Sequence, residues 1–426
     1  MKRWQYIWIF FTCCFLTGFA QPVLHGRVIT FDTHKPVALA NVFLSNTSLG
    51  KLTDERGEFT ITKFPSGRYD LVVSFIGYET YSVQLESAHL PDSLEIILKP
   101  KVIELQEVIV ESYDKDGWEK WGNIFLMHFM GTSQFAEQCR LLNKGTLKFR
   151  FNKKINLLRV SADEPLVIEN KALGYVLRYS LAHFEYNFNE HIFFYGGYPF
   201  FEQMKTNRAG LQKKWIENRE FAYYGSLLHF MRSLYRNQLI EQGFDVRKKI
   251  ILTEVEKARV TEIVQQAKYK RLPPEGFSTS FTKPSPMNDP DSVGYFRKVD
   301  MQVVGSSLLL DKVLTADSIA YSIDSMAVEL SFSGHMGVWY PAKVFPSRYP
   351  GNSGLFFARA ISVNSDIFLP SGKPVIIFSN GTYANGENLL TDGYWAWWEK
   401  MANKLPYEYW PPKKESPNQK VEALSN

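Results

Sequence analysis

Cysteine is scarce in this chain of 426 residues, which contains 3. Two of them, Cys13 and Cys14, fall in an N-terminal stretch that we expect to be removed, so only Cys139 remains in the mature chain. A single thiol cannot form an intrachain disulfide. An exported chain of this size must then be held by an ordinary apolar core. We interpret Cys139 as a small buried apolar residue rather than as a catalytic thiol.

The sequence motifs of the common hydrolases are missing as well. None of the 8 His residues is followed by Glu three positions later, so the His-x-x-Glu pair of a zinc carboxypeptidase is absent. The motifs His-Glu-x-x-His and Gly-x-Ser-x-Gly and the Walker loop are absent too. We therefore predict no catalytic residues, no metal ligands and no cofactor.

Three weaker patterns leave alternatives open. The Ser-x-x-Lys spacing at 112–115 lies in a linker rather than at a helix start. His183 and His191, with Glu185, would bind a metal only if their strands faced one side. The acidic run at 288–291 contains Ca²⁺-type oxygen ligands but also has the composition of an ordinary turn. In each case we favour the structural interpretation.

Charge of neither sign dominates the chain. The 49 basic and 44 acidic residues give a formal net charge of +5, and no basic block stands out. This distribution excludes the electrostatic footprint of a nucleic-acid-binding surface.

Long apolar runs are absent after residue 20. No later stretch approaches the roughly 18 residues that a membrane helix requires. Residues 1–20 have the features of a signal peptide: Lys2 and Arg3, an apolar run, and small residues at Gly18 and Ala20. A lipoprotein signal is the poorer interpretation, because the residues before Cys13 do not match a lipobox. We predict an exported mature chain that begins near Gln21 and has no transmembrane helix.

Short alternating strands are abundant, and aromatic residues make up 15% of the chain. Residues 21–99 contain about seven strand patterns and no helix signal. Asp54 can accept hydrogen bonds from nearby backbone groups, and Gly57 and Gly67 can adopt the positive φ that tight turns require. Many short strands joined by such turns predict a β-sandwich.

Five motifs in this region occur in a characteristic order. They are "GRV" at 26–28, "ANVFL" at 40–44, "TDERGEF" at 53–59, "PSGRYDL" at 65–71 and "IGY" at 76–78. Together they resemble the carboxypeptidase regulatory-like domain, which has a transthyretin-like sandwich fold. The resemblance covers about a fifth of the chain. It implies a scaffold and no activity of the domain itself.

The same module precedes the plug of nutrient-importing outer-membrane receptors in Gram-negative bacteria. There it is followed by a short hydrophobic box that an energising protein grips by adding a strand. Residues 104–116, "ELQEVIVESYDKD", resemble that box, although a linker strand is the plainer interpretation. The remaining 300 or so residues are too few for a plug and a barrel, so we do not expect such a receptor. Segments at 167–175, 223–234 and 392–412 also resemble uncharacterised bacterial envelope proteins, a resemblance that implies a location and no reaction.

The rest of the chain is predicted to be mainly β with some helix, an α+β domain at 121–410 after a linker at 100–120. Apolar spacing predicts a helix at 224–239, with His229 and Arg232 on its polar face, and a second helix at 394–405. Strand patterns return in 249–264. Proline-rich connections are expected at 272–291 and 341–354, and residues 411–426 are expected to be a disordered tail. The predicted fold is a seven-stranded sandwich followed by a larger antiparallel β-rich domain with two or more helices.

Aromatic side chains gather near the C-terminus. On a helical wheel most of them share the apolar face of the predicted helix at 394–405, with Glu399, Lys400 and Lys404 on the polar face. Trp395, Tyr409 and Trp410 lie at its margin or beyond. They are our candidates for an exposed ligand-binding platform, to which sugar rings could stack.

The leading hypothesis is a non-enzymatic, exported cell-envelope protein that binds or assembles with an envelope protein or glycan. We place it in the periplasm or at the outer membrane of a Gram-negative bacterium. The alternatives are a hydrolase of unfamiliar type in the C-terminal domain and a glycan-binding module. The sequence leaves open the ligand, the oligomeric state, the side of the outer membrane and whether the large domain is catalytic.

Overall fold

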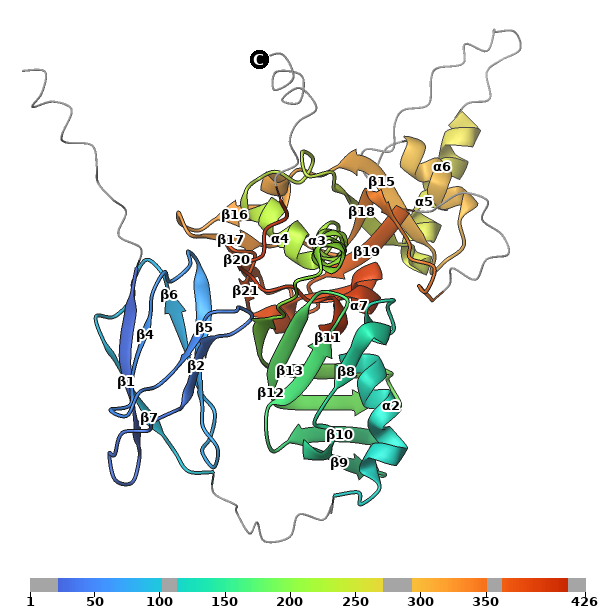
Figure 1. Cartoon of the computed structure of the whole chain (residues 1–426). Helices are drawn as coiled ribbons and strands as arrows, with labels where there is room; N and C mark the ends of the chain where they lie inside the picture. Colours follow the sequence, from blue (N-terminus) through green and yellow to red (C-terminus); the bar gives the residue numbers. More distant parts are fainter. Residues whose placement is uncertain (1–21, 102–112, 271–292, 351–361, 413–426) are drawn as a thin grey trace, which may run out of the picture. The chain divides into compact units, whose positions relative to one another are not determined.

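The computed structural model describes residues 22–101, 113–270, 293–350 and 362–412 (Figure 1). The chain divides into two compact units, one of residues 1–45 and 49–105 and one of residues 46–48 and 106–426. The predicted signal peptide, most of the box-like segment at 104–116, the connection at 272–291 and most of the tail lie outside the described residues. Among the residues described, every helix is too short or too polar to cross a membrane.

In its described residues, the first unit is a β-sandwich of seven strands in two sheets. One sheet has the order β4-β1-β7, with bounds β1 (Leu24–Thr30), β4 (Glu58–Ile61) and β7 (Leu94–Leu98). The other has the order β3-β2-β5-β6, with bounds β2 (Asn41–Leu44), β3 (Gly50–Leu52), β5 (Arg68–Ser74) and β6 (Tyr81–Glu86). β1 and β7 pair in parallel, and the other pairs are antiparallel. The predicted sandwich is confirmed.

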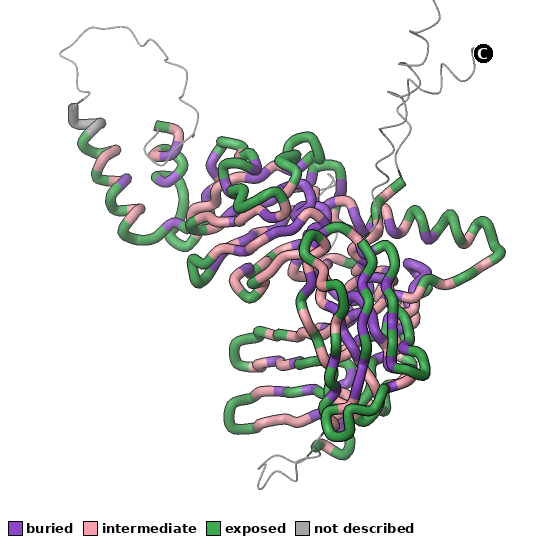
Figure 2. Tube along the Cα trace, turned by 90° about the vertical axis from the view of Figure 1, so that its left-hand side faces the viewer, coloured by how far each residue is buried: buried purple, intermediate pink, exposed green. Residues whose placement is uncertain are grey.

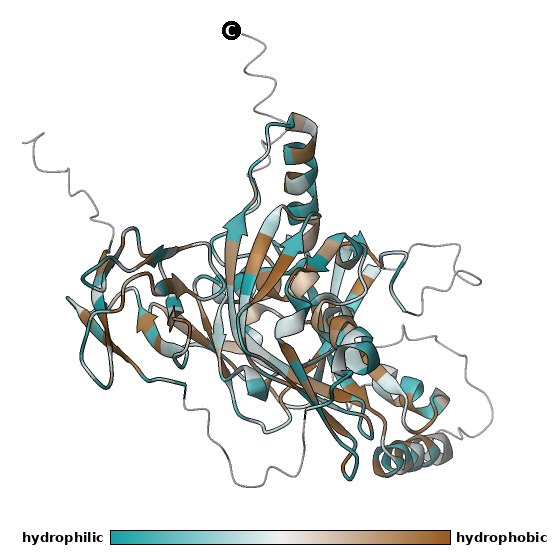
Figure 3. Cartoon of the chain, turned by 60° about the horizontal axis from the view of Figure 1, so that its bottom comes forward, coloured by the Kyte–Doolittle hydropathy of each residue, from teal (hydrophilic) through white to brown (hydrophobic). Residues whose placement is uncertain are grey.

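Alternation along the strands explains why this sequence forms two facing sheets. In β4, Phe59 and Ile61 are buried whereas Glu58 and Thr60 are exposed. Successive side chains of a strand point to opposite faces, so this pattern buries one face and leaves the other to solvent. Figure 3 shows the same division, with apolar colour along the strands of this unit and hydrophilic colour in several of its turns.

The turn before β4 depends on Asp54 and Gly57. Asp54 Oδ1 accepts the backbone N–H groups of Arg56 at 2.9 Å and Glu58 at 2.8 Å. Gly57 has φ 73°, and a Cβ added there would lie 2.4 Å from the carbonyl oxygen of Val28. Any side chain at this position therefore combines backbone strain with a clash against a strand.

Replacing Gly57 by alanine is expected to destabilise the first unit by about 2–4 kcal/mol. Gly77→Ala is the matched control, because Gly77 also has a positive φ, 84°, but open space around its Cβ position. We expect the control to cost about 1 kcal/mol, from the backbone conformation alone. Urea denaturation of both variants measures the difference, and equal losses would contradict the proposed clash.

The second unit begins with a helix on a six-stranded antiparallel sheet. The strand order is β8-β11-β12-β10-β9, and β13 pairs with the other edge of β12. The helix is α2 (Gly117–Phe129), and its Phe125 packs against Phe149 and Phe184 of the sheet (Figure 1). The strand bounds are β8 (Cys139–Leu141), β9 (Leu147–Asn152), β10 (Leu157–Ala162), β11 (Leu166–Asn170), β12 (Tyr175–Asn187) and β13 (Ile192–Gln203).

Two further antiparallel sheets complete this unit. The five-stranded sheet, of order β15-β14-β18-β19-β22, comprises β14 (Asp245–Ile251), β15 (Ser307–Val313), β18 (His335–Val344), β19 (Ser362–Phe368) and β22 (Leu390–Gly393). The four-stranded sheet, of order β16-β17-β20-β21, comprises β16 (Ala320–Ser322), β17 (Ala327–Leu330), β20 (Val375–Phe378) and β21 (Tyr383–Ala384). The expected connection at 341–354 begins late, because β18 continues through Pro341 to Val344.

Five more helices join α2 in the described part of this unit. They are α3 (Ala209–Tyr223), α4 (Leu227–Tyr235), α5 (Glu254–Lys270), α6 (Val293–Met301) and α7 (Tyr394–Trp398). The predicted class, a larger antiparallel β-rich domain with two or more helices, is confirmed. The helices α2, α3 and α6 were not anticipated from the sequence.

The strand prediction across 249–264 is wrong after β14. The strand ends at Ile251, and Thr253 Oγ1 accepts the backbone N–H of Glu256 at 3.2 Å, which starts α5. Val260 of α5 then packs with Tyr295 and Val299 of α6 in a small separate core. Figure 2 shows α5 as a mostly exposed helix with little buried surface. The few apolar residues of α5 are spaced in a way that also fits a strand pattern, which explains the wrong prediction.

The two predicted helices exist but are shorter than expected. α4 begins after Ser226, whose side chain accepts the backbone N–H of His229 at 3.1 Å. Its predicted polar face is wrong, because His229 and Arg232 are each 1% exposed. α7 ends at Trp398, and a 3₁₀ turn follows at Met401–Asn403. The burial of the predicted polar face of α4 and the early end of α7 both matter for the site, because they place charged side chains such as Arg232 and Lys400 in the core.

Candidate functional site

Arg232 of α4 is a buried cation that binds three backbone carbonyls. Its Nε donates to Asn380 O at 2.8 Å, Nη1 donates to Tyr409 O at 2.8 Å, and Nη2 donates to Tyr407 O at 2.6 Å. The guanidinium also lies 3.7 Å from the ring centroid of Trp410. The planar fork of arginine suits such simultaneous contacts. Arg232 therefore fixes the path of residues 407–410.

Glu399 follows α7 and turns toward the start of α4. Its Oε1 accepts the backbone N–H of Leu227, the first residue of α4, at 2.9 Å. A carboxylate at this position satisfies a helix N–H that has no partner within the helix. Burial raises the pKa of the Glu399 carboxyl above its ordinary value, although the Leu227 hydrogen bond and the nearby Lys404, Lys343 and Lys400 oppose the shift.

Lys343 of β18 is buried among aromatic rings. Its Nζ donates to the carbonyl oxygens of Phe221 at 2.6 Å and Tyr224 at 2.9 Å. The same atom lies 4.5 Å from the ring centroid of Trp398 and 5.3 Å from that of Tyr394. Burial lowers the pKa of Lys343 to about 7, against the opposing effect of Glu399. Burial likewise lowers the pKa of Lys400 to about 8.

A small cavity of about 60 Å³ lies beside Glu399, and Ser226, Tyr383, Asn403 and Lys404 are among the residues that line it. An acid with a raised pKa beside amines with lowered pKa values is a composition that occurs at acid–base sites. This cavity has room for water but not for a sugar ring or a peptide unit. Glu399 Oε1 and Lys343 Nζ are also hydrogen-bonded to backbone groups. The arrangement stabilises the junction of α4 with the C-terminal segment.

His229, in the first turn of α4, makes two further polar contacts near this junction. Its Nδ1 accepts the backbone N–H of Gly225 at 3.2 Å, and its Nε2 lies 3.2 Å from Oε1 of Gln242. Burial lowers the pKa of His229 to about 4, so the ring is neutral at pH 7. A neutral, doubly hydrogen-bonded ring positions the first turn of α4.

The structure separates the three aromatic candidates. Trp395 is 2% exposed and donates its Nε1–H to Gly225 O at 2.8 Å, so the expectation that it is exposed is wrong. Other segments cover α7 on several sides. Trp395, which lies at the margin of the apolar face on the helical wheel, is therefore buried in the core. Tyr409 is half-buried, and Trp410 is 42% exposed. Of the three side chains, only Trp410 offers much surface to a ligand.

The other sequence candidates do not converge on a metal site. Within the described ranges, no group of three or more His, Cys, Asp or Glu side chains could hold a metal ion. His191 lies in the turn before β13, where its Nδ1 is 3.4 Å from the Tyr186 hydroxyl. Burial raises the pKa of the Cys139 thiol to about 12, which disfavours a nucleophilic thiolate. Ser112 and residues 288–291 lie outside the described residues.

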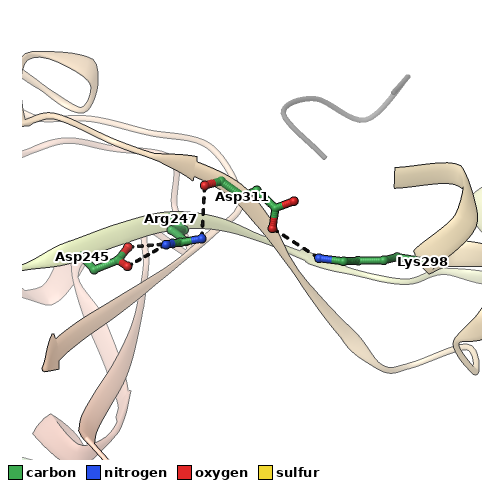
Figure 4. A network of polar contacts seen from close by, with 4 residues as sticks. All are labelled: Asp245, Arg247, Lys298 and Asp311. Carbon is green, nitrogen blue, oxygen red and sulfur yellow. Dashed lines mark hydrogen bonds and ion pairs between the residues drawn. The ribbon is translucent and has the colours of Figure 1, made fainter. Parts of the chain in front are cut away.

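A network of charged residues links α6 with two strands of the five-stranded sheet (Figure 4). Asp245 accepts two hydrogen bonds from Arg247, at 2.7 and 2.8 Å, and Arg247 also donates to Asp311 O at 3.1 Å. Lys298 of α6 lies 3.3 Å from Asp311 Oδ1. These side chains are partly exposed, and such pairs contribute little to stability. The network positions α6 rather than forming a reactive centre.

The roles of Arg232, Lys343 and Glu399 have no clear signal in the sequence. Each lies in a pattern that is typical of a solvated helix face or strand. The nearest clue is the concentration of aromatic residues between Lys343 and Trp410, because buried cations often lie against aromatic rings.

Comparison with known proteins identifies the first unit. Residues 24–110 match the CarboxypepD_reg-like domain family, so this part of the chain is a carboxypeptidase regulatory-like domain, as expected. TonB-dependent receptor P39 of Formosa agariphila is 36% identical over 94 residues, which are 22% of this chain and 9% of that receptor. The chain thus matches less than a tenth of the receptor's length.

Two solved structures show weaker likeness. A cohesin–X-dockerin complex from Acetivibrio cellulolyticus has 19% identity and a TM-score of 0.17, over 18% of this chain and 57% of that one. The TIE protein of Bacillus anthracis has 10% identity and a TM-score of 0.16, over 43% of this chain and 31% of that one. TM-scores this low bear on neither fold nor function.

Proposed function

We propose that this chain is a non-enzymatic, exported protein of the Gram-negative cell envelope that binds or assembles with an envelope partner. The carboxypeptidase regulatory-like domain at 24–110, which a TonB-dependent receptor shares, carries this proposal. The predicted signal peptide at 1–20 supports export. In this proposal the sandwich and the β-rich unit act as binding or assembly modules in the periplasm or at the outer membrane.

The chemistry of the second unit supports a non-catalytic role. Two of its buried groups with shifted pKa values, Glu399 and Lys343, hydrogen-bond to the backbone of Leu227, Phe221 and Tyr224. The cavity beside Glu399 is smaller than a substrate unit of a peptide or glycan. These groups are already engaged in holding the fold together.

The test combines localisation with turnover. The full chain with a C-terminal epitope tag is expressed in a Gram-negative host, and a variant lacking residues 2–20 is its control. We expect the tag in the envelope fraction for the full chain and in the cytoplasm for the control. Purified mature chain is expected to leave peptide and glycan libraries unchanged by mass spectrometry. Cytoplasmic retention of the full chain, or hydrolysis that Glu399→Gln abolishes, would overturn the proposal.

A glycan-binding module is the second candidate. The observation that favours it is the exposed ring of Trp410, which Arg232 and Arg236 contact at centroid distances of 3.7 and 4.4 Å. Glycan-array binding should then fall for Trp410→Ala and persist for Phe194→Ala, since Phe194 is an exposed aromatic residue of β13. Equal binding by both variants would reject this candidate.

A further inference from the structure

A second, larger pocket lies in the same unit between α2 and the β8 region. Its volume is about 410 Å³, within the range of about 300–1,000 Å³ that is typical of small-molecule sites. Trp118, Leu126 and Met130 line it from α2 and its end, and Ala136, Cys139 and Leu141 line it from the opposite side. Apolar side chains predominate among the residues that line it, and none of our sequence interpretations identified this pocket.

The sulfur in this wall adds no charge. Cys139 Sγ donates to Phe135 O at 3.3 Å, and burial raises the pKa of this thiol to about 12. The thiol is therefore protonated at neutral pH and acts as a small apolar group. Covalent capture of a ligand by a thiolate is not expected here.

Positive charge lies at the edge of the pocket. Arg140 is exposed and is the one charged side chain among the described residues that line it. No ion pair or hydrogen bond engages its guanidinium within the described part of the chain. Two acids lie near Arg140, and each is paired with another cation: Glu137 with Arg348 at 2.6 Å, and Glu169, the cross-strand partner of Arg140, with Lys171 at 3.2 Å. A second cation, Lys144, lies 5.3 Å from the ring centroid of Trp118.

We propose that this pocket binds an anionic amphiphile, specifically an alkyl carboxylate of medium chain length. The alkyl chain would contact Trp118, Leu126 and Met130, and the carboxylate would pair with Arg140. Burial of the alkyl chain against these apolar side chains favours binding, and the arginine guanidinium binds a carboxylate through two hydrogen bonds. A neutral or cationic amphiphile would leave Arg140 unpaired. This proposal does not rest on the envelope function.

Isothermal titration of the purified mature chain with decanoate, below its micelle concentration, tests the site. We expect saturable binding at one site, with decanol and decylammonium binding about tenfold more weakly because they cannot pair with Arg140. Arg140→Gln should weaken decanoate binding about tenfold and leave decanol binding unchanged. Arg297→Gln, at an exposed position of α6, is the matched control and should bind decanoate like wild type.

Ala136→Phe fills the pocket and should abolish binding of both decanoate and decanol. Three results would overturn the proposal: no saturable decanoate binding by wild type, equal affinities for decanoate and decanol, or an unchanged decanoate affinity in Arg140→Gln. If Ala136→Phe does not fold, the surface variant Arg140→Gln and the alcohol comparison still decide the outcome.

Discussion

Replacing Arg232 by alanine is expected to lower the free energy of unfolding of the second unit by about 3–5 kcal/mol. The carbonyl oxygens of Asn380, Tyr407 and Tyr409 would each lose a charge-assisted hydrogen bond. The ring of Trp410 would lose the guanidinium against which it packs. Three of these four contacts are with residues 407–410, so the C-terminal part of the fold should loosen first.

Two variants separate the role of the planar guanidinium of Arg232 from the role of its charge. Arg236→Ala removes the other arginine that lies over Trp410 and should cost about 1 kcal/mol or less. Arg232→Lys keeps the charge, but one ammonium cannot reproduce the planar set of donors, so it should lie between wild type and alanine. Urea denaturation and limited proteolysis near residue 407 measure these effects. Similar losses for Arg232→Ala and Arg236→Ala would contradict the assignment.

Lys343 is expected to make the stability of the second unit rise with pH. Its pKa is about 7 in the folded chain and 10.5 ordinarily. Between these values the unfolded chain holds a proton that the folded chain does not, so raising the pH favours folding. The gain is at most about 1.4 kcal/mol per pH unit and about 3 kcal/mol between pH 7 and 10.

Comparison with Lys343→Met isolates this contribution. The difference in unfolding free energy between wild type and this variant should shift in favour of wild type as the pH rises from 7 to 10. The absolute difference also contains the lost hydrogen bonds to Phe221 and Tyr224, so the slope with pH is the quantity of interest. Lys213→Met reports the effect of removing a surface lysine at each pH. A difference for Lys343→Met that stays constant over this range would refute the prediction.

The sandwich could be predicted because its signals are local. Asp54, Gly57 and Gly67 act on neighbouring backbone, and Phe59 and Ile61 alternate with polar residues over a few positions. The helix α5 could not be predicted in the same way. Val260 is buried only because Tyr295 and Val299 of α6 cover it. The spacing of apolar residues within α5 does not show that α6 is its packing partner.

The candidate site was harder to predict because a helical wheel assumes a single solvent face. On the wheel, Glu399 lies opposite the aromatic residues of α7. In the structure α7 ends at Trp398, and the next residue turns toward the N–H of Leu227. Trp395 is likewise placed by its bond to Gly225, 170 positions earlier in the chain. Contacts of that sequence separation leave no periodic pattern.

The contacts of Arg232 also set an order for synthesis and folding. Its partners Tyr407 and Tyr409 follow it by 175 and 177 positions, so α4 leaves the ribosome long before the carbonyls that bind it. Contacts this distant in sequence form late, because a long loop must close first. We therefore expect the second unit to complete its core only after residue 410 has been made. Until then the nascent chain would remain incompletely folded, which is the state that the proposed export requires if it threads the chain unfolded.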